Sequence, residues 1–304
     1  MGSLIRQARG AAATFIAGVV FVLLGAPAAL AAEKVFPSPE AAMAAFGDAI
    51  ASSDEDALKV IFGADFRELI PPVGAEIRYR FLEQWAKAHA IRSAGDAKAL
   101  MAVGNDGWTF PVPIVKTADG WRFDTFAGVD EIRIRRIGRN ELAVMRVMLA
   151  VFDAQKEYAA HDRNGNGVRE YAMKFESSPG KRDGLYWAAR AGEEPSPVGP
   201  TLARARAAGS GKDGYYGYRY RLLTAQGPNA PGGAFDFVVV GRMIGGFAVV
   251  AWPVRYGDTG VMTFMVSHDG VVYEKDLGPD TARKAAALRR FDPDATWQKA
   301  EPAP

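Results

Sequence analysis

The stretch from residue 214 to residue 278 decides the fold of the C-terminal half of the chain. It reads GYYGYRYRLLTAQGPNAPGGAFDFVVVGRMIGGFAVVAWPVRYGDTGVMTFMVSHDGVVYEKDLG. Runs rich in Val, Phe, Tyr and Thr alternate with Gly, Pro, Asn and Asp, which is the pattern of an antiparallel meander. The runs expected as strands are 215–224, 234–241, 246–252, 260–267 and 271–274.

A helix is expected directly before this meander. Leu142, Met145, Met148 and Phe152 recur at helical spacing after Asn140, a residue that suits a helix N-cap. The sequence therefore predicts a helix over 141–160 that packs its apolar face on the sheet. We expect helix and meander to form a C-terminal α+β domain over residues 139–304.

The N-terminal part combines helices with a second set of strands. Ser38 is expected to cap a helix over 39–51, and Asp54 a second helix that stops at Gly63. A third helix over 79–91 precedes strands expected at 97–103, 107–116 and 120–126. Helices followed by a curved antiparallel sheet resemble nuclear transport factor 2-like and cystatin-like domains, which is a fold-level analogy. We expect an α+β domain over residues 32–138.

Residues 1–31 have the pattern of a secretory signal peptide. Arg6 and Arg9 precede an apolar run over 11–24, and Ala29-Leu30-Ala31 forms an A-x-A cleavage site. An uncleaved anchor is the alternative, but the run is shorter than the ~20 residues of a membrane span. The chain has no Cys, so it has neither a lipid-attachment cysteine nor disulfides. We expect an exported protein of the bacterial periplasm, with no stable membrane span after cleavage.

The charge balance does not indicate nucleic-acid binding. The formal net charge is +2, and it includes Arg6 and Arg9 of the segment expected to be removed. The mature chain would therefore be near neutral, without the basic surface that nucleic acid requires. The expected partner is an envelope protein or a ligand that the sequence does not identify.

Residues 162–167 match the first half of a calcium loop. Asp162, Asn164 and Asn166 alternate before a glycine at the sixth position, and Glu170 stands at the ninth. The twelfth position holds Met173 where a bidentate acid is expected. A calcium site formed by Asp162, Asn164, Asn166 and Glu170 is therefore one interpretation. A turn stabilised by its own Asp and Asn side chains, with no metal and no cofactor, is the other.

Aromatic residues gather in the meander. Tyr216, Tyr218, Trp252 and Tyr256 are candidates for a binding surface, since Tyr and Trp are enriched in such surfaces. Cross-strand packing inside the sheet is the alternative.

No motif in the chain identifies a catalytic residue. The sequence contains no G-x-S-x-G, no H-E-x-x-H and no cysteine nucleophile. Asp48, Asp65 and Glu68 are the acids to inspect in the pocket of a nuclear transport factor 2-like cone, with ordinary surface or capping roles as the alternative.

Several longer motifs resemble a known family. They are WRFD at 121–124, DGLYW at 183–187, AWP at 251–253 and YEKDLG at 273–278. Across about residues 36–298 the chain resembles the exported bacterial family catalogued as domain of unknown function 2950. That resemblance implies export and no particular activity. The architecture over 140–278 also resembles the globular part of type IV pilins and pseudopilins.

These observations leave three functional hypotheses. The first is a non-catalytic binding or envelope-assembly scaffold module. The second is a hydrolase-type enzyme that uses acids in the N-terminal pocket or the cleft between domains. The third is a calcium-stabilised binding module.

Overall fold

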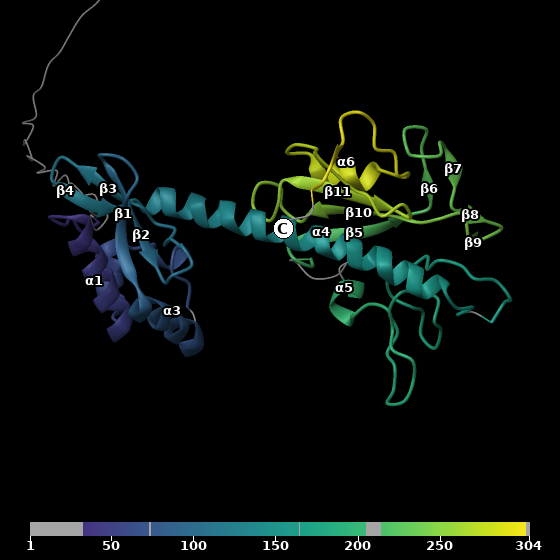
Figure 1. The fold of residues 1–304 in the computed structure, drawn as a ribbon, viewed down its shortest axis with the longest axis horizontal. Helices are drawn as coiled ribbons and strands as arrows, with labels where there is room; N and C mark the ends of the chain where they lie inside the picture. Colours follow the sequence, from purple (N-terminus) through teal and green to yellow (C-terminus); the bar gives the residue numbers. More distant parts are fainter. Residues whose placement is uncertain (1–32, 73, 164, 205–213, 302–304) are drawn as a thin grey trace, which may run out of the picture.

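A computed structural model describes residues 33–72, 74–163, 165–204 and 214–301. Helices and antiparallel sheets make an α+β protein, as predicted. Figure 1 shows two lobes, one built from residues 33–124 and one from residues beyond 140, connected by a single long helix. The expected signal peptide at 1–31 lies outside the described residues.

The N-terminal lobe packs helices against a four-stranded antiparallel sheet of order β1-β2-β3-β4. Its elements are α1 (Pro39–Ser52), α2 (Glu55–Phe62), η1 (Phe66–Glu68), α3 (Ala75–Lys87), β1 (His89–Ser93), β2 (Lys98–Val103), β3 (Ile114–Thr117) and β4 (Gly120–Phe123). Both predicted caps are confirmed. Ser38 Oγ accepts a hydrogen bond from Ala41 N at 3.2 Å, and Asp54 Oδ1 accepts one from Ala57 N at 2.9 Å.

Three expectations for this lobe were wrong in detail. The helix expected over 79–91 ends at Lys87, because His89–Ser93 pairs with β2 as an edge strand. The strand expected over 107–116 is reduced to Ile114–Thr117, since the prolines upstream lack the N–H that a ladder needs. The strand expected over 120–126 ends at Phe123, where Asp124 caps the next helix.

That next helix, α4 (Thr125–Ala159), is longer than predicted. Asn140 was expected as its N-cap, but Asn140 lies inside the helix and donates to the Thr259 carbonyl at 2.8 Å. The first turns of α4 pack on the N-terminal lobe, where Gly128 faces Val112. The boundary expected between residues 138 and 139 therefore falls within one continuous helix, and the division into domains stays a prediction.

Neighbouring arginines bind α4 to both lobes. Arg135 donates to the carbonyl oxygen of Thr109 in the N-terminal lobe at 2.6 Å. Arg136 forms an ion pair with Asp258 in the C-terminal lobe. Because a guanidinium offers several donors in a rigid plane, each contact fixes direction as well as distance.

The C-terminal lobe contains a five-stranded antiparallel sheet of order β13-β12-β11-β10-β5. The strands are β5 (Tyr218–Leu223), β10 (Ala248–Pro253), β11 (Met262–Ser267), β12 (Val272–Asp276) and β13 (Gln298–Lys299). The run 234–241 was expected in this sheet and is not part of it. The run contains β7 (Phe235–Asp236) and β8 (Val238–Val239), which pair in separate short ribbons with β6 (Ala225–Gln226) and β9 (Arg242–Met243). In the five-stranded sheet β5 therefore pairs directly with β10.

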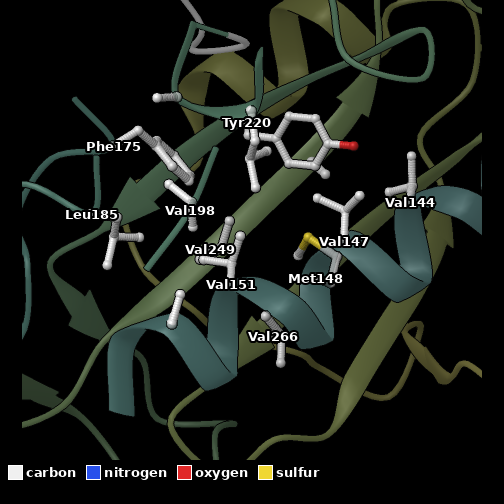
Figure 2. Close-up of a cluster of buried hydrophobic side chains, with 14 of the residues drawn as sticks. Val144, Val147, Met148, Val151, Phe175, Leu185, Val198, Tyr220, Val249 and Val266 are labelled. Carbon is white, nitrogen blue, oxygen red and sulfur yellow. The ribbon is translucent and has the colours of Figure 1, made fainter. Parts of the chain in front are cut away.

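Helices cover both faces of this sheet. Figure 2 shows Val147, Met148 and Val151 of α4 packed toward Val249 and Val266 of the sheet, which confirms the predicted helix-on-meander contact. On the opposite face, Ala285 of α6 (Thr281–Ala287) and Phe291 are buried with Trp252. A further short helix, α5 (Pro200–Arg204), lies on the α4 side.

Residues 160–163 and 165–199 contain no helix or strand, and a buried side chain holds this segment to α4. Gln155 is fully buried, donates from Nε2 to the Ala172 carbonyl at 2.9 Å and accepts from Ala172 N at 2.8 Å. The amide thereby replaces a β-ladder partner for this segment. The three hydrophobic cores draw their described members from residues 36–300.

Candidate functional site

An apolar cavity of about 350 Å³ lies in the N-terminal lobe, between α1, α2, α3 and the loop that carries Pro71 and Pro72. Its apolar lining residues are Phe46, Ala49, Ile50, Leu58, Leu69, Ile70, Ile77, Phe81, Trp108 and Phe110. Small-molecule sites typically have volumes of about 300–1,000 Å³ and apolar walls with a few polar groups. This cavity has both properties.

Phe46 forms the inner wall of the cavity. Its ring packs against Phe110 and Phe62 at centroid distances of 4.7 and 5.8 Å, and Phe81 lies at 5.9 Å. The next residue, Gly47, lets α1 approach α3, because a Cβ there would lie 2.5 Å from the Trp85 ring. The sequence thus builds a rigid aromatic wall from helices that are close together.

The polar side chains of the cavity wall are those of Ser53, Glu55, Arg67 and Arg78. Arg67 forms an ion pair with Glu55 at the rim. The Nε atom of Arg78 is buried and has no hydrogen-bond partner among the described residues. Because an unpaired buried N–H is costly, Arg78 is poised to bind an acceptor that enters the cavity. Ile77 is 56% exposed, which places an apolar side chain at the entrance.

The acids expected in an N-terminal pocket do not line this cavity. Asp48, Asp65 and Glu68 are exposed. Asp65 and Glu68 border a separate depression of about 400 Å³, together with Glu33. Among the described residues, Glu55 is the one carboxylate of the apolar cavity, and it is paired with Arg67.

The loop at 162–167 is held by hydrogen bonds from its own polar side chains. Asp162 accepts from Asn166 N at 3.1 Å and from Gly167 N at 2.7 Å, and Asn166 donates to Glu170 at 3.0 Å. The remaining candidate ligand, Asn164, lies outside the described residues. Within the described part of the chain, no three His, Cys, Asp or Glu side chains cluster closely enough to hold a metal ion. Calcium binding therefore stays a prediction, and the described carboxylates have hydrogen-bond partners within the protein.

We expect calcium to leave the stability of this protein unchanged. Since Asp162 already bonds the loop backbone, Ca²⁺ would have to displace those bonds, and ligand-linked stabilisation would be small. Melting curves in excess Ca²⁺ and in excess chelator should therefore superimpose. A melting temperature that rises with Ca²⁺ concentration, and no longer does so in Asp162→Asn, would establish the calcium site instead.

The four aromatic candidates are not gathered on one surface. Tyr218 and Trp252 are buried in the cores on opposite faces of the C-terminal sheet. Tyr216 is half exposed with a positive φ of 51°, and Tyr256 donates to Asp276 at 3.1 Å. Alternation along strands explains the separation, because successive side chains point to opposite faces.

Fold and cavity together describe an α+β protein with an apolar cavity in its N-terminal lobe, whose wall includes Arg67 and Arg78. The chain belongs to the protein family of unknown function DUF2950, whose family model matches residues 33–300. No curated protein and no solved structure shows significant similarity to it. Within the described residues, no helix is both long enough and apolar enough to cross a membrane.

Proposed function

We propose that this protein is an exported, non-catalytic binding protein of the bacterial envelope. Its ligand is an apolar chain or ring system that ends in an anionic group. Export is supported by the signal-peptide pattern of residues 1–31. The compartment proposed is the periplasm, and the partner class is a small amphipathic molecule rather than nucleic acid.

One observation carries the ligand class: the wall of an apolar cavity includes Arg78, whose buried Nε has no hydrogen-bond partner in the part of the chain that the structure describes. The apolar walls favour hydrocarbon, since burying apolar surface contributes about 25 cal/mol per Å². Arg78 and Arg67 outnumber the single carboxylate Glu55, so the mouth favours an anion. A guanidinium is suited to both carboxylate and phosphate, through paired N–H donors.

The test compares dodecanoate with dodecanol, which share a chain and differ in the head group. Trp108 lines the cavity, so tryptophan fluorescence follows binding. We expect the wild-type protein to bind dodecanoate more tightly than dodecanol. Arg78→Met should bind dodecanoate about tenfold more weakly, because charge-assisted hydrogen bonds contribute about 1.5–3 kcal/mol. Its affinity for dodecanol should be unchanged. The variant should fold normally, because methionine keeps the apolar stem and removes an unsatisfied donor.

Arg80→Met is the matched control. Arg80 lies on the same helix, pairs with Glu76 at 2.8 Å and does not line the cavity. It should bind both compounds like the wild type. The proposal is overturned if neither compound binds, or if the two arginine variants bind dodecanoate equally well.

A further inference from the structure

The β8–β9 hairpin carries an unusual residue at its tip. Val239 pairs with Arg242, so Val240 and Gly241 form the two-residue turn. Val240 has a φ of +50° and is 95% exposed. A β-branched residue is disfavoured in this left-handed region, and hairpin turns of this kind prefer Asn-Gly. Neither backbone geometry nor packing accounts for a valine here, so the exposed side chain itself points to a binding role.

Further apolar side chains are exposed on the same ribbon. Val239 and Ile244 are each nearly half exposed beside Val240. Figure 1 shows β8 and β9 at the end of the C-terminal lobe that is remote from the N-terminal lobe. The apolar side chains therefore stand on a narrow projecting tip. Such a tip is far smaller than the ~800 Å² per partner of a standard protein–protein interface.

Basic side chains surround the base of the hairpin. Val240, Gly241 and Arg242 border a cavity of about 900 Å³. The charged residues of its wall are Arg163, Lys174, Lys181, Arg182 and Arg242, against Glu170 and Asp183. Lys174 pairs with Asp183 at 2.7 Å, and Arg163 and Arg182 both pair with Glu194. Within the described residues, Lys181 and Arg242 have no ion-pair partner and are available to an external anion.

We propose that the β8–β9 hairpin docks this protein on an anionic phospholipid bilayer. Val239 and Val240 insert at the level of the acyl boundary, and Lys181 and Arg242 bind headgroup phosphates. Two interactions hold proteins on anionic membranes: apolar side chains enter the membrane–water interface, and basic side chains beside them bind the anionic headgroups. This site is separate from the N-terminal cavity and does not depend on the ligand proposed for it.

The experiment uses the mature chain expected after cleavage of the segment at 1–31, mixes it with vesicles of phosphatidylglycerol or of phosphatidylcholine, and measures flotation. We expect binding to phosphatidylglycerol alone, weakened between ~0.1 M and ~1 M salt because the screening length falls from ~10 Å to ~3 Å. Val240→Asn should weaken binding about tenfold, since one buried valine is worth that factor. Its melting temperature should not fall, because Asn-Gly suits the turn.

Two further variants complete the test. The double variant Lys181→Gln/Arg242→Gln should lose the preference for phosphatidylglycerol. Val60→Asn, which alters a valine 55% exposed in the other lobe, should bind like the wild type. The proposal is overturned if the wild type binds neither kind of vesicle. It is equally overturned if Val240→Asn binds like the wild type, or if Val60→Asn weakens binding as much.

Discussion

Glu141→Ala is expected to destabilise the protein by about 3 kcal/mol, because the carboxylate bonds α4 to the start of β11. Its Oε1 atom accepts from Val261 N at 2.8 Å and from Met262 N at 2.9 Å, and the Tyr218 hydroxyl lies at 3.3 Å. Burial and the Glu141 carboxylate raise the pKa of Tyr218 far above its usual range, so its hydroxyl stays a donor. Removing the acceptor leaves the N–H groups of Val261 and Met262 without this partner in a partly buried place, whereas the Tyr218 hydroxyl can still donate to the Met262 carbonyl at 3.0 Å.

Urea denaturation measures this loss. Glu141→Gln should lose less, because the amide oxygen can still accept. Glu157→Ala is the control on the same helix, since Glu157 is exposed and should change stability by less than about 0.5 kcal/mol. Equal stabilities for Glu141→Ala and Glu157→Ala would show that this contact does not hold α4 to the sheet.

Phe46→Ala should cost about 3–5 kcal/mol, the range for truncating a buried phenylalanine. Phe46 is 1% exposed and packs against five aromatic rings, those of Phe62, Phe81, Trp85, Phe110 and Phe123. The substitution also widens the proposed ligand cavity on its inner side. We therefore expect both a lower stability and a weaker affinity for dodecanoate.

The matched control is Phe126→Ala. Phe126 is 82% exposed at the start of α4, so its truncation removes little packing. Its denaturation midpoint and dodecanoate affinity should equal those of the wild type. If Phe46→Ala were as stable as Phe126→Ala, the aromatic wall would not be the core of the N-terminal lobe.

Local capping signals made much of the fold predictable from the sequence. The side chains of Ser38 and Asp54 each accept a hydrogen bond from the free helix N–H three residues further along the chain. A short motif therefore contains both partners of the contact. The strands of the meander were equally predictable where the turns between them are tight, as at Asp269-Gly270 between β11 and β12. In each case the stabilising interaction lies within a few residues of the signal.

The errors arose where distant contacts decide the structure. The charged residues after Thr125 dilute the helical periodicity, and the early turns of α4 are fixed by packing of Gly128 on Val112 and Leu69. Likewise, His89–Ser93 becomes a strand through pairing with β2. Short apolar runs fit helix and strand alike, so only the tertiary partner separates the two.

The candidate site was not foreseen for the same reason. Its walls combine α1, α2, α3 and the loops before α3 and β3, which no local pattern connects. One sequence signal could have pointed to the cavity: Arg78 stands beside Ile77 and near Phe81 on one helix. Residues chosen by type, such as Asp65 and Trp252, lie elsewhere because side-chain chemistry alone does not show which side chains share a cavity.

Photo-crosslinking with a diazirine-bearing fatty acid tests the central claim, that the N-terminal cavity binds an apolar anion. We predict that mass spectrometry will place the adducts on cavity residues such as Ile70, Ile77 and Trp108. Excess dodecanoate should suppress the labelling and Arg78→Met should reduce it. Adducts confined to the C-terminal lobe, or spread over the surface and insensitive to dodecanoate, would contradict the account.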